Sequence, residues 1–194
     1  MANKYFICGL HPCLAALKNP KRIIKNIFCS ENIFNKYSDL LKGFNYNIVN
    51  EQKLLTLTPY DVNHQGIVVE VFPITQSKIE TIDFSDSNCK VTILDQITDP
   101  HNVGAIIRSA AAFNISTVIL GENNSPQENT VMAKAASGAL EKINLLRVTN
   151  LKYAIQYLQK NNFWIVGLDS NVDKFLDSEV LKGRIGIVLG AEGK

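Results

Sequence analysis

The sequence predicts an α/β protein with two domains, a small N-terminal α/β domain and a larger C-terminal domain built on a parallel sheet. Two observations support this prediction. Strand-like and helix-like segments alternate along the chain, which is typical of layered α/β folds. In the second half the strand-like segments are continuous apolar runs, as in parallel sheets that helices cover on both faces. We expect domains over 1–73 and 90–194, joined by a linker over 74–89.

The N-terminal domain is expected to alternate strands with helices. Apolar residues between 32 and 44 recur at helical spacing, and the β-branched segment 66–72 reads as a strand that ends at Pro73. A short helix is stopped by Pro59. The expected strands cover 25–30, 46–49 and 66–72, and the expected helices cover 32–44 and 53–57.

The segment 74–89 is polar, rich in Ser, Thr and Asp, and only weakly periodic, which favours a linker. A second α/β series follows it. The expected strands cover 91–94, 117–120, 143–148, 163–168 and 185–189, and the expected helices cover 102–113, 127–140 and 151–159.

The composition excludes several classes of protein. The 194 residues are 46% hydrophobic and 20% charged, with a formal net charge of +2, as in ordinary globular proteins. No apolar run approaches the roughly 20 residues that span a bilayer, and the start lacks the basic and apolar regions of a secretory signal. We therefore expect a cytoplasmic protein with no membrane partner.

The four cysteines are Cys8, Cys13, Cys29 and Cys89. Their spacings fit no common zinc pattern, although His11 lies between the first two and a metal cluster can be imagined. Free and mostly buried thiols in a reducing cytosol are the preferred alternative. We predict no metal site.

Positive charge gathers in the N-terminal domain, where residues 1–73 carry eight lysines and arginines against five acids. A basic cluster around Pro20 could hold phosphates, and a polar pair before the strand at 66–72 could meet RNA. Solvated turns are the alternative in both places. The candidate RNA-binding residues are Lys18, Lys21, Arg22, Lys25, His64 and Gln65.

The densest group of polar residues lies between the strand at 91–94 and the helix at 102–113. In open α/β sheets, ligands bind beyond the carboxyl ends of the strands, and free amides at a helix start can bind phosphate. The polar residues of this turn are Asp95, Asp99, His101 and Asn102.

Arg108 lies among small and apolar residues of the same helix, so we expect it to be buried and to need a partner. Gly104 lies one turn earlier, and its missing side chain would leave space over the guanidinium for a ligand or another chain. A structural arginine paired with a nearby carboxylate is the alternative.

A second group of candidate residues follows the last strand, where residues 187–193 run into a glycine-rich turn with one acid. Glycines let the backbone approach a ligand closely. The turn matches neither a Walker A loop nor a G-x-G-x-x-G fingerprint. Separately, the small residues at 137–141 suit close packing against another segment.

The run DPHNVGAIIRSAAAF (99–113) together with GAEG (190–193) resembles the SpoU (TrmH-like) branch of the SPOUT RNA methyltransferases. HQG (64–66) and SGALE (137–141) fit as well, and the resemblance is closest to bacterial 23S rRNA guanosine-2'-O-methyltransferases. It implies an N-terminal RNA-binding domain like certain ribosomal proteins and a C-terminal SPOUT domain with a trefoil knot. It also implies S-adenosylmethionine as methyl donor, RNA as substrate and a homodimer.

Carried over by position, the resemblance implies that Asn102, Arg108 and Glu192 are catalytic. It implies that Gly190 binds the donor, with Leu189, Ala191 and Gly193 as further contacts. A ribose 2'-hydroxyl would attack the methyl carbon of the donor. We expect Arg108 to hold an RNA phosphate or stabilise developing alkoxide charge, oriented by Glu192.

The third motif of the family, an Asn- and Ser-bearing segment after GAEG, does not occur in the 194 residues. If the protein ends at Lys194, we expect a knot that cannot close, doubtful donor binding and exposed apolar surface. If the sequence continues beyond Lys194, we expect the rest of the knot in that tail, and the stop so soon after GAEG favours a missing tail. An RNA-binding remnant without a complete donor site, a tRNA 2'-O-methyltransferase and another kind of nucleotide-binding enzyme are the alternatives.

Overall fold

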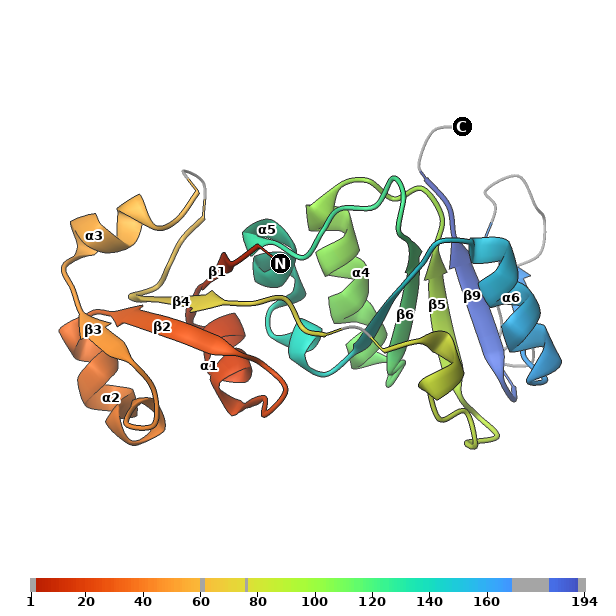
Figure 1. Cartoon of the computed structure of the whole chain (residues 1–194), viewed down its shortest axis with the longest axis horizontal. Coiled ribbons are helices and arrows are strands. Elements are labelled where there is room, and N and C mark those ends of the chain that lie inside the picture. Colours follow the sequence, from red (N-terminus) through yellow and green to blue (C-terminus); the bar gives the residue numbers. More distant parts are fainter. Residues whose placement is uncertain (1–2, 60–61, 76, 169–181, 192–194) are drawn as a thin grey trace. The chain divides into compact units, whose positions relative to one another are not determined.

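Two separate β-sheets organise the chain in the computed structural model, which describes residues 3–59, 62–75, 77–168 and 182–191 (Figure 1). The described residues form two units. The first unit combines residues 1–75 with 100–108 and 126–142. The second unit combines residues 76–99, 109–125 and 143–194.

The sheet of the first unit is mixed. Its strands are β1 (Tyr5–Cys8), β2 (Ile24–Cys29), β3 (Tyr46–Ile48) and β4 (Ile67–Val71), in the order β1-β4-β2-β3. The central strand β4 runs antiparallel to β1 and β2, whereas β2 and β3 are parallel. Four of the five β4 side chains are buried, which suits the β-branched sequence of that strand.

Three helices accompany this sheet: α1 (Leu10–Lys18), α2 (Glu31–Leu41) and α3 (Glu51–Thr56). The side chains of Ser30 and Asn50 accept hydrogen bonds from the first turns of α2 and α3, so both helices begin at a capping residue. All the segments predicted in this half are confirmed within a few residues. Strand β1 and helix α1 have no counterpart in the prediction.

The sheet of the second unit is wholly parallel over its described strands, as predicted. The strands are β5 (Lys90–Leu94), β6 (Thr117–Gly121), β7 (Asn144–Val148), β8 (Trp164–Gly167) and β9 (Ile185–Leu189). Their order is β7-β6-β5-β9-β8, so the winding reverses between β5 and β9. Helix α6 (Leu151–Lys160) packs buried side chains against this sheet.

Two more helices follow the first two strands of this series. Helix α4 spans Pro100–Ala112, and α5 spans Thr130–Ala136 and continues into the 3₁₀ helix η2 (Ala139–Glu141). Both were expected, although α5 is shorter than the predicted segment 127–140. Among the described helices, none has the length and apolar character that crossing a membrane requires.

The predicted linker does more than connect the domains. It contains the 3₁₀ helix η1 (Ile79–Thr81), and its Ile79 and Phe84 are buried in the core of the second unit. The ring of Phe84 meets that of Phe163 edge to face, with centroids 5.1 Å apart. Apolar residues within a polar sequence therefore anchor this segment. The exact domain boundaries stay predictions.

Candidate functional site

The carboxyl ends of β5 and β9 lie side by side in the second unit. Leu94 pairs with Leu189, and the amide of Asp95 donates a hydrogen bond of 2.9 Å to the carbonyl of Leu189. The winding of the sheet reverses between these two strands, which is where open α/β sheets bind ligands. The structure thus places the predicted donor-binding residues Leu189, Gly190 and Ala191 at this edge.

The turn after β9 is open. Gly190 and Ala191 are exposed, and a Cβ added at Gly190 would meet nothing within 4 Å. Backbone without a shielding side chain can approach a ligand closely. Glu192 and Gly193 lie outside the described residues, and the trefoil knot implied by the resemblance stays a prediction.

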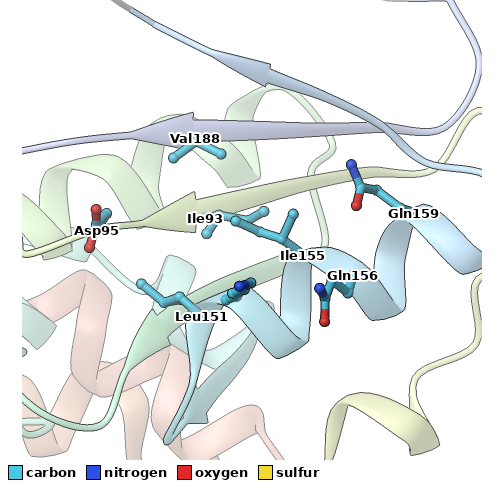
Figure 2. A pocket seen from close by; sticks show the side chains of 8 residues that line it. Ile93, Asp95, Leu151, Ile155, Gln156, Gln159 and Val188 are labelled. Carbon is cyan, nitrogen blue, oxygen red and sulfur yellow. The ribbon is translucent and has the colours of Figure 1, made fainter.

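A cavity of about 410 Å³ lies on the face of the sheet beneath α6 (Figure 2). Its volume falls in the range of roughly 300–1,000 Å³ typical of small-molecule sites. Its lining combines apolar side chains with a polar edge. The residues are Ile93, Asp95, Leu151, Lys152, Ile155, Gln156, Gln159 and Val188.

Sequence reasoning missed the contribution of α6 to this cavity. Lys152, Gln156 and Gln159 follow one another at intervals of four and three residues, which places them on one face of the helix. That spacing could have indicated the cavity lining from sequence. Polar residues at helical spacing are, however, equally typical of an ordinary solvent-exposed helix face.

Asn102 and Arg108 both lie exposed on α4. The expectation of a buried Arg108 is wrong, and among the described residues none forms an ion pair with it. The physical reason is the alanine-rich sequence around Arg108, because small side chains do not force a helix face out of water. Val103 and Ile107 carry the buried face instead.

Gly104 does not leave space for a ligand, as the sequence had suggested. A Cβ at this position would lie 2.5 Å from the carbonyl oxygen of Met132 and 2.7 Å from the Cβ of Ala135. Both residues belong to α5. The space that a side chain at Gly104 would fill is therefore taken up by residues of α5, which packs closely against α4.

The segment 137–141 packs closely, as its small residues predicted. Gly138 has a φ of +89°, and a Cβ there would approach the Cβ of Ala15 in α1 to 2.9 Å. Glycine is favoured at this position for both reasons. The following helix η2 contains Glu141, whose side chain pairs with Arg22.

The basic cluster around Pro20 divides into exposed and buried members. Lys18, Lys21 and Lys25 are exposed, as an RNA contact requires. Arg22 is 5% exposed and is bound to two carboxylates, so its prediction as a surface RNA contact is wrong. Sequence proximity to three lysines did not reveal partners that lie more than a hundred residues away along the chain.

Arg22 is held from several directions. Its Nη2 lies 2.6 Å from Oε1 of Glu141, its Nη1 donates 2.9 Å to the carbonyl of Phe72, and the same Nη1 contacts Glu128. Burial alone would lower the pKa of Arg22, but the hydrogen bonds to Glu141 and the charges of Glu128 and Glu141 raise it. The guanidinium is thus firmly cationic.

The HQG segment forms a structural turn. His64 is buried, and its Nδ1 accepts a hydrogen bond of 3.0 Å from the amide of Gly66, so little of the ring can reach RNA. Gln65 is exposed, but its Oε1 accepts a hydrogen bond of 3.0 Å from the amide of Leu10. The polar-turn alternative describes His64 well, whereas Gln65 keeps part of its amide at the surface.

Lys134 of α5 supports the same turn. Its Nζ donates a hydrogen bond of 2.7 Å to the carbonyl of Asn63. No pattern in the sequence indicated that Lys134 supports this turn. Across the described residues, no group of three or more His, Cys, Asp or Glu side chains is arranged to hold a metal ion.

Two family models match the chain. Residues 90–194 match the SpoU rRNA Methylase family, and residues 6–77 match RNA 2'-O ribose methyltransferase substrate binding. Together the two matches extend over nearly the whole sequence.

Similar proteins include the 23S rRNA (guanosine-2'-O-)-methyltransferase RlmB of Pasteurella multocida, which is 34% identical over 97% of this chain and 80% of its own length. RlmB of Vibrio vulnificus is 33% identical over 100% of this chain and 81% of its own length. Among solved structures, the SpoU methyltransferase AviRb from Streptomyces viridochromogenes, in complex with AdoMet, matches the fold with a TM-score of 0.77. It is 15% identical, over 96% of this chain and 73% of its own. The chain belongs to the SpoU rRNA methylase family.

Proposed function

We propose that this chain transfers a methyl group from S-adenosylmethionine to the 2'-hydroxyl of a ribose in 23S rRNA, as a cytoplasmic homodimer. The observation that carries the proposal is the exposed pair Asn102 and Arg108 on α4, within the part that matches the methylase family. The RlmB relatives act, by their names, on a guanosine of 23S rRNA. The match of residues 6–77 supports an RNA-binding role for the N-terminal part.

Leu189, Gly190 and Ala191 are the residues proposed to hold the donor, with Gly193 beside them in sequence. The open space around Gly190 suits this role, because it leaves backbone groups accessible. The donor supplies an electrophilic methyl group attached to a positively charged sulfur.

The chemical step needs alignment and charge stabilisation. The ribose oxygen forms a bond to the methyl carbon, the carbon–sulfur bond breaks, and the hydroxyl proton leaves. Positioning of the two reactants can contribute roughly 7–11 kcal/mol. Arg108 is proposed to bind an RNA phosphate or to stabilise the developing alkoxide, because a guanidinium does not give up its proton in proteins. Asn102 and Glu192 complete the proposed catalytic set.

Asn102 and Arg108 are suited to a large substrate. They are six positions apart on the helix, which corresponds to about 9 Å along the axis and a rotation of about 120° between the two side chains. They would therefore contact different groups of the substrate.

Lys18, Lys21, Lys25 and Gln65 are the proposed RNA contacts. Arg22 and His64 do not belong to that set, because both side chains are buried.

Exposed apolar side chains support a partner surface for the proposed homodimer. Trp164 and Leu168, on and just after the edge strand β8, are both exposed. Sedimentation of the purified protein over a range of concentrations tests this. A single monomeric species at all concentrations would contradict the homodimer.

Methyl transfer to RNA tests the function directly. Radiolabelled donor is incubated with the protein and with 23S rRNA or tRNA transcripts, and the modified ribose is mapped. Label in 23S rRNA supports the proposal, and label only in tRNA points to the tRNA enzyme. Failure of a calorimetric donor titration, combined with retained RNA binding, would favour an RNA-binding protein without catalysis.

The role of Arg108 has its own test. We expect Arg108→Ala to abolish most of the rate and Arg108→Lys to restore only part of it, because lysine lacks the planar fork of donors. A near wild-type rate for Arg108→Lys would show that a simple positive charge is sufficient.

A further inference from the structure

A buried network of charges joins the N-terminal segment of the chain to the segment around α5. The side chain of Arg22 is 0% exposed, and those of Glu128 and Glu141 are 7% and 4% exposed. We infer that Arg22 is a positioning residue for methyl transfer, which holds α5 and through it the catalytic helix α4. This inference rests on the proposed function.

Both carboxylates of the network are fully engaged. Glu128 accepts hydrogen bonds from the hydroxyl of Tyr5 at 2.5 Å and from the amide of Ile74 at 3.3 Å. Glu141 accepts a hydrogen bond of 2.7 Å from the side chain of Asn19. With one guanidinium between two carboxylates, Arg22 is the cation on which the whole network depends.

The two acids bracket α5. Glu128 precedes the helix, whose first turn is capped by the side chain of Asn129, and Glu141 lies in η2 just after it. Arg22 binds both acids at once, so it fixes both ends of the segment 128–141 against the N-terminal strands. Helix α5 also contacts β1 and α1 directly.

Helix α5 in turn sets the position of α4. The backbone of Met132 and the Cβ of Ala135 lie against Gly104 so closely that no side chain fits between them. Gly104 is two residues from Asn102 and one turn from Arg108 on α4. A displacement of α5 would therefore move the helix that carries both proposed catalytic side chains.

Stability alone does not require such a network. Buried ion pairs can often be replaced by apolar residues without loss of stability, because desolvation offsets most of the charge attraction. An apolar side chain cannot, however, bind two carboxylates in fixed directions, as the planar guanidinium does. Catalysis is sensitive to such direction, since a misplacement of about 1 Å can reduce a rate about 100-fold.

The test compares Arg22→Met and Arg22→Lys with a matched control, Lys42→Met, in the full chain. Lys42 is a solvent-exposed partner of Asp39 and has no place in the proposed site. We expect Arg22→Met to lower kcat by about 10- to 100-fold. Arg22→Lys should recover part of that loss, while the calorimetric affinity for the donor stays unchanged in both. A wild-type kcat in a folded Arg22→Met variant would overturn the inference. A decrease in kcat that is fully explained by the fraction of unfolded variant protein would overturn it as well.

Two further measurements keep the inference testable. Amide hydrogen exchange over 100–108 and 130–141 should accelerate in Arg22→Met, and unchanged exchange would contradict the coupling even if no RNA is methylated. If Arg22→Met does not fold, Glu128→Gln replaces it, because the amide keeps acceptor capacity while removing one negative charge. That variant should reduce kcat less than Arg22→Met and accelerate the same amides. Absence of methyl transfer by the wild type, with these exchange changes present, would count against the proposed function alone.

Discussion

Gly104 tolerates little change, because the backbone of α5 lies directly against it. A methyl group there would press on the backbone of Met132, and overpacking of this kind costs about 1–3 kcal/mol. That cost exceeds the gain of about 1 kcal/mol in helix propensity when alanine replaces glycine. We therefore expect Gly104→Ala to lower the free energy of unfolding in denaturant titrations.

Gly43 provides the matched control, because a Cβ at that position meets nothing within 4 Å. Gly43→Ala should change the free energy of unfolding by less than about 0.5 kcal/mol. Equal stability of the two variants would mean that α5 does not lie against α4 as described.

The cysteines should be poorly reactive in the native protein. Cys8, Cys13 and Cys29 are buried, and burial raises the pKa of the Cys8 thiol to about 12. Burial also raises the pKa of Cys89, which is only half-buried. A raised pKa leaves little thiolate below that pKa, and the thiolate is the reactive form.

At pH 8 we thus expect an alkylating reagent to modify Cys89 slowly and the other three cysteines only after denaturation. Mass spectrometry of the native and the denatured protein counts the modified thiols. Rapid labelling of Cys8 or Cys13 in the native state would contradict the burial of these thiols.

The two arginines show why single residues are hard to place from sequence. Arg22 was expected at the surface because lysines surround it, yet its partners Glu128 and Glu141 follow 106 and 119 residues later. Arg108 was expected inside because its neighbours are apolar, yet those neighbours are small enough to leave it exposed. In both cases the neighbours in sequence are known, but the residues that the fold brings near from distant parts of the chain are not.

At the scale of elements, the anchoring of the segment 74–89 has a measurable consequence. Phe84 is buried against Phe163, whereas Phe113 is 76% exposed at the end of α4. We expect Phe84→Ala to lower the free energy of unfolding by about 3–5 kcal/mol, as for other buried phenylalanines. Phe113→Ala, the same chemical change at the surface, should have a much smaller effect in the same denaturant titration. Equal effects would show that the segment is not part of the core.

Continuous apolar strands and helices with strong periodicity could be predicted from the sequence, and the structure confirms them. Segment 91–94 forms β5 because a continuous apolar run suits a strand that is buried on both faces. Segment 151–159 forms α6 because its apolar residues recur at helical spacing. Helix α1 was missed because it carries Pro12 near its start, and the short strand β1 directly before it was missed with it. Proline is tolerated in a first helical turn, but it is usually read as a stop.

At the scale of the molecule, segments that are distant in the sequence belong to the same compact unit. The sequence predicted a division near residues 74–89, whereas the first unit of the structure also includes 100–108 and 126–142. Close contacts at Gly104 and Gly138 make this arrangement possible, and glycine spacing alone does not identify the partner of each contact. The candidate residues on α4 and after β9 were found because motifs mark them. In the network around Arg22 only Glu141 falls in a motif, SGALE, while Arg22 and Glu128 do not.

The distribution of exposed lysines makes the last prediction, which concerns how the whole chain binds RNA. Lys18, Lys21 and Lys25 are exposed around Pro20, in the part that matches an RNA substrate-binding domain. Each phosphate contact releases counterions, so the logarithm of affinity falls with the logarithm of salt by about 0.7–0.9 per contact. Replacing all three lysines with Gln should therefore weaken binding to an rRNA fragment and reduce this slope by about 2–3.

A second triple variant removes the same charge from the same part of the chain. Lys36, Lys42 and Lys53 are also exposed, but they lie on or beside α2 and α3, away in sequence from the Pro20 turn. If RNA binds at the Pro20 turn, changing these three lysines to Gln lowers only the overall positive charge of the protein. The dependence of RNA affinity on salt then stays close to that of the wild type. Equal slopes for the two triple variants in filter-binding titrations would mean that net charge attracts the RNA and that the Pro20 turn does not position it.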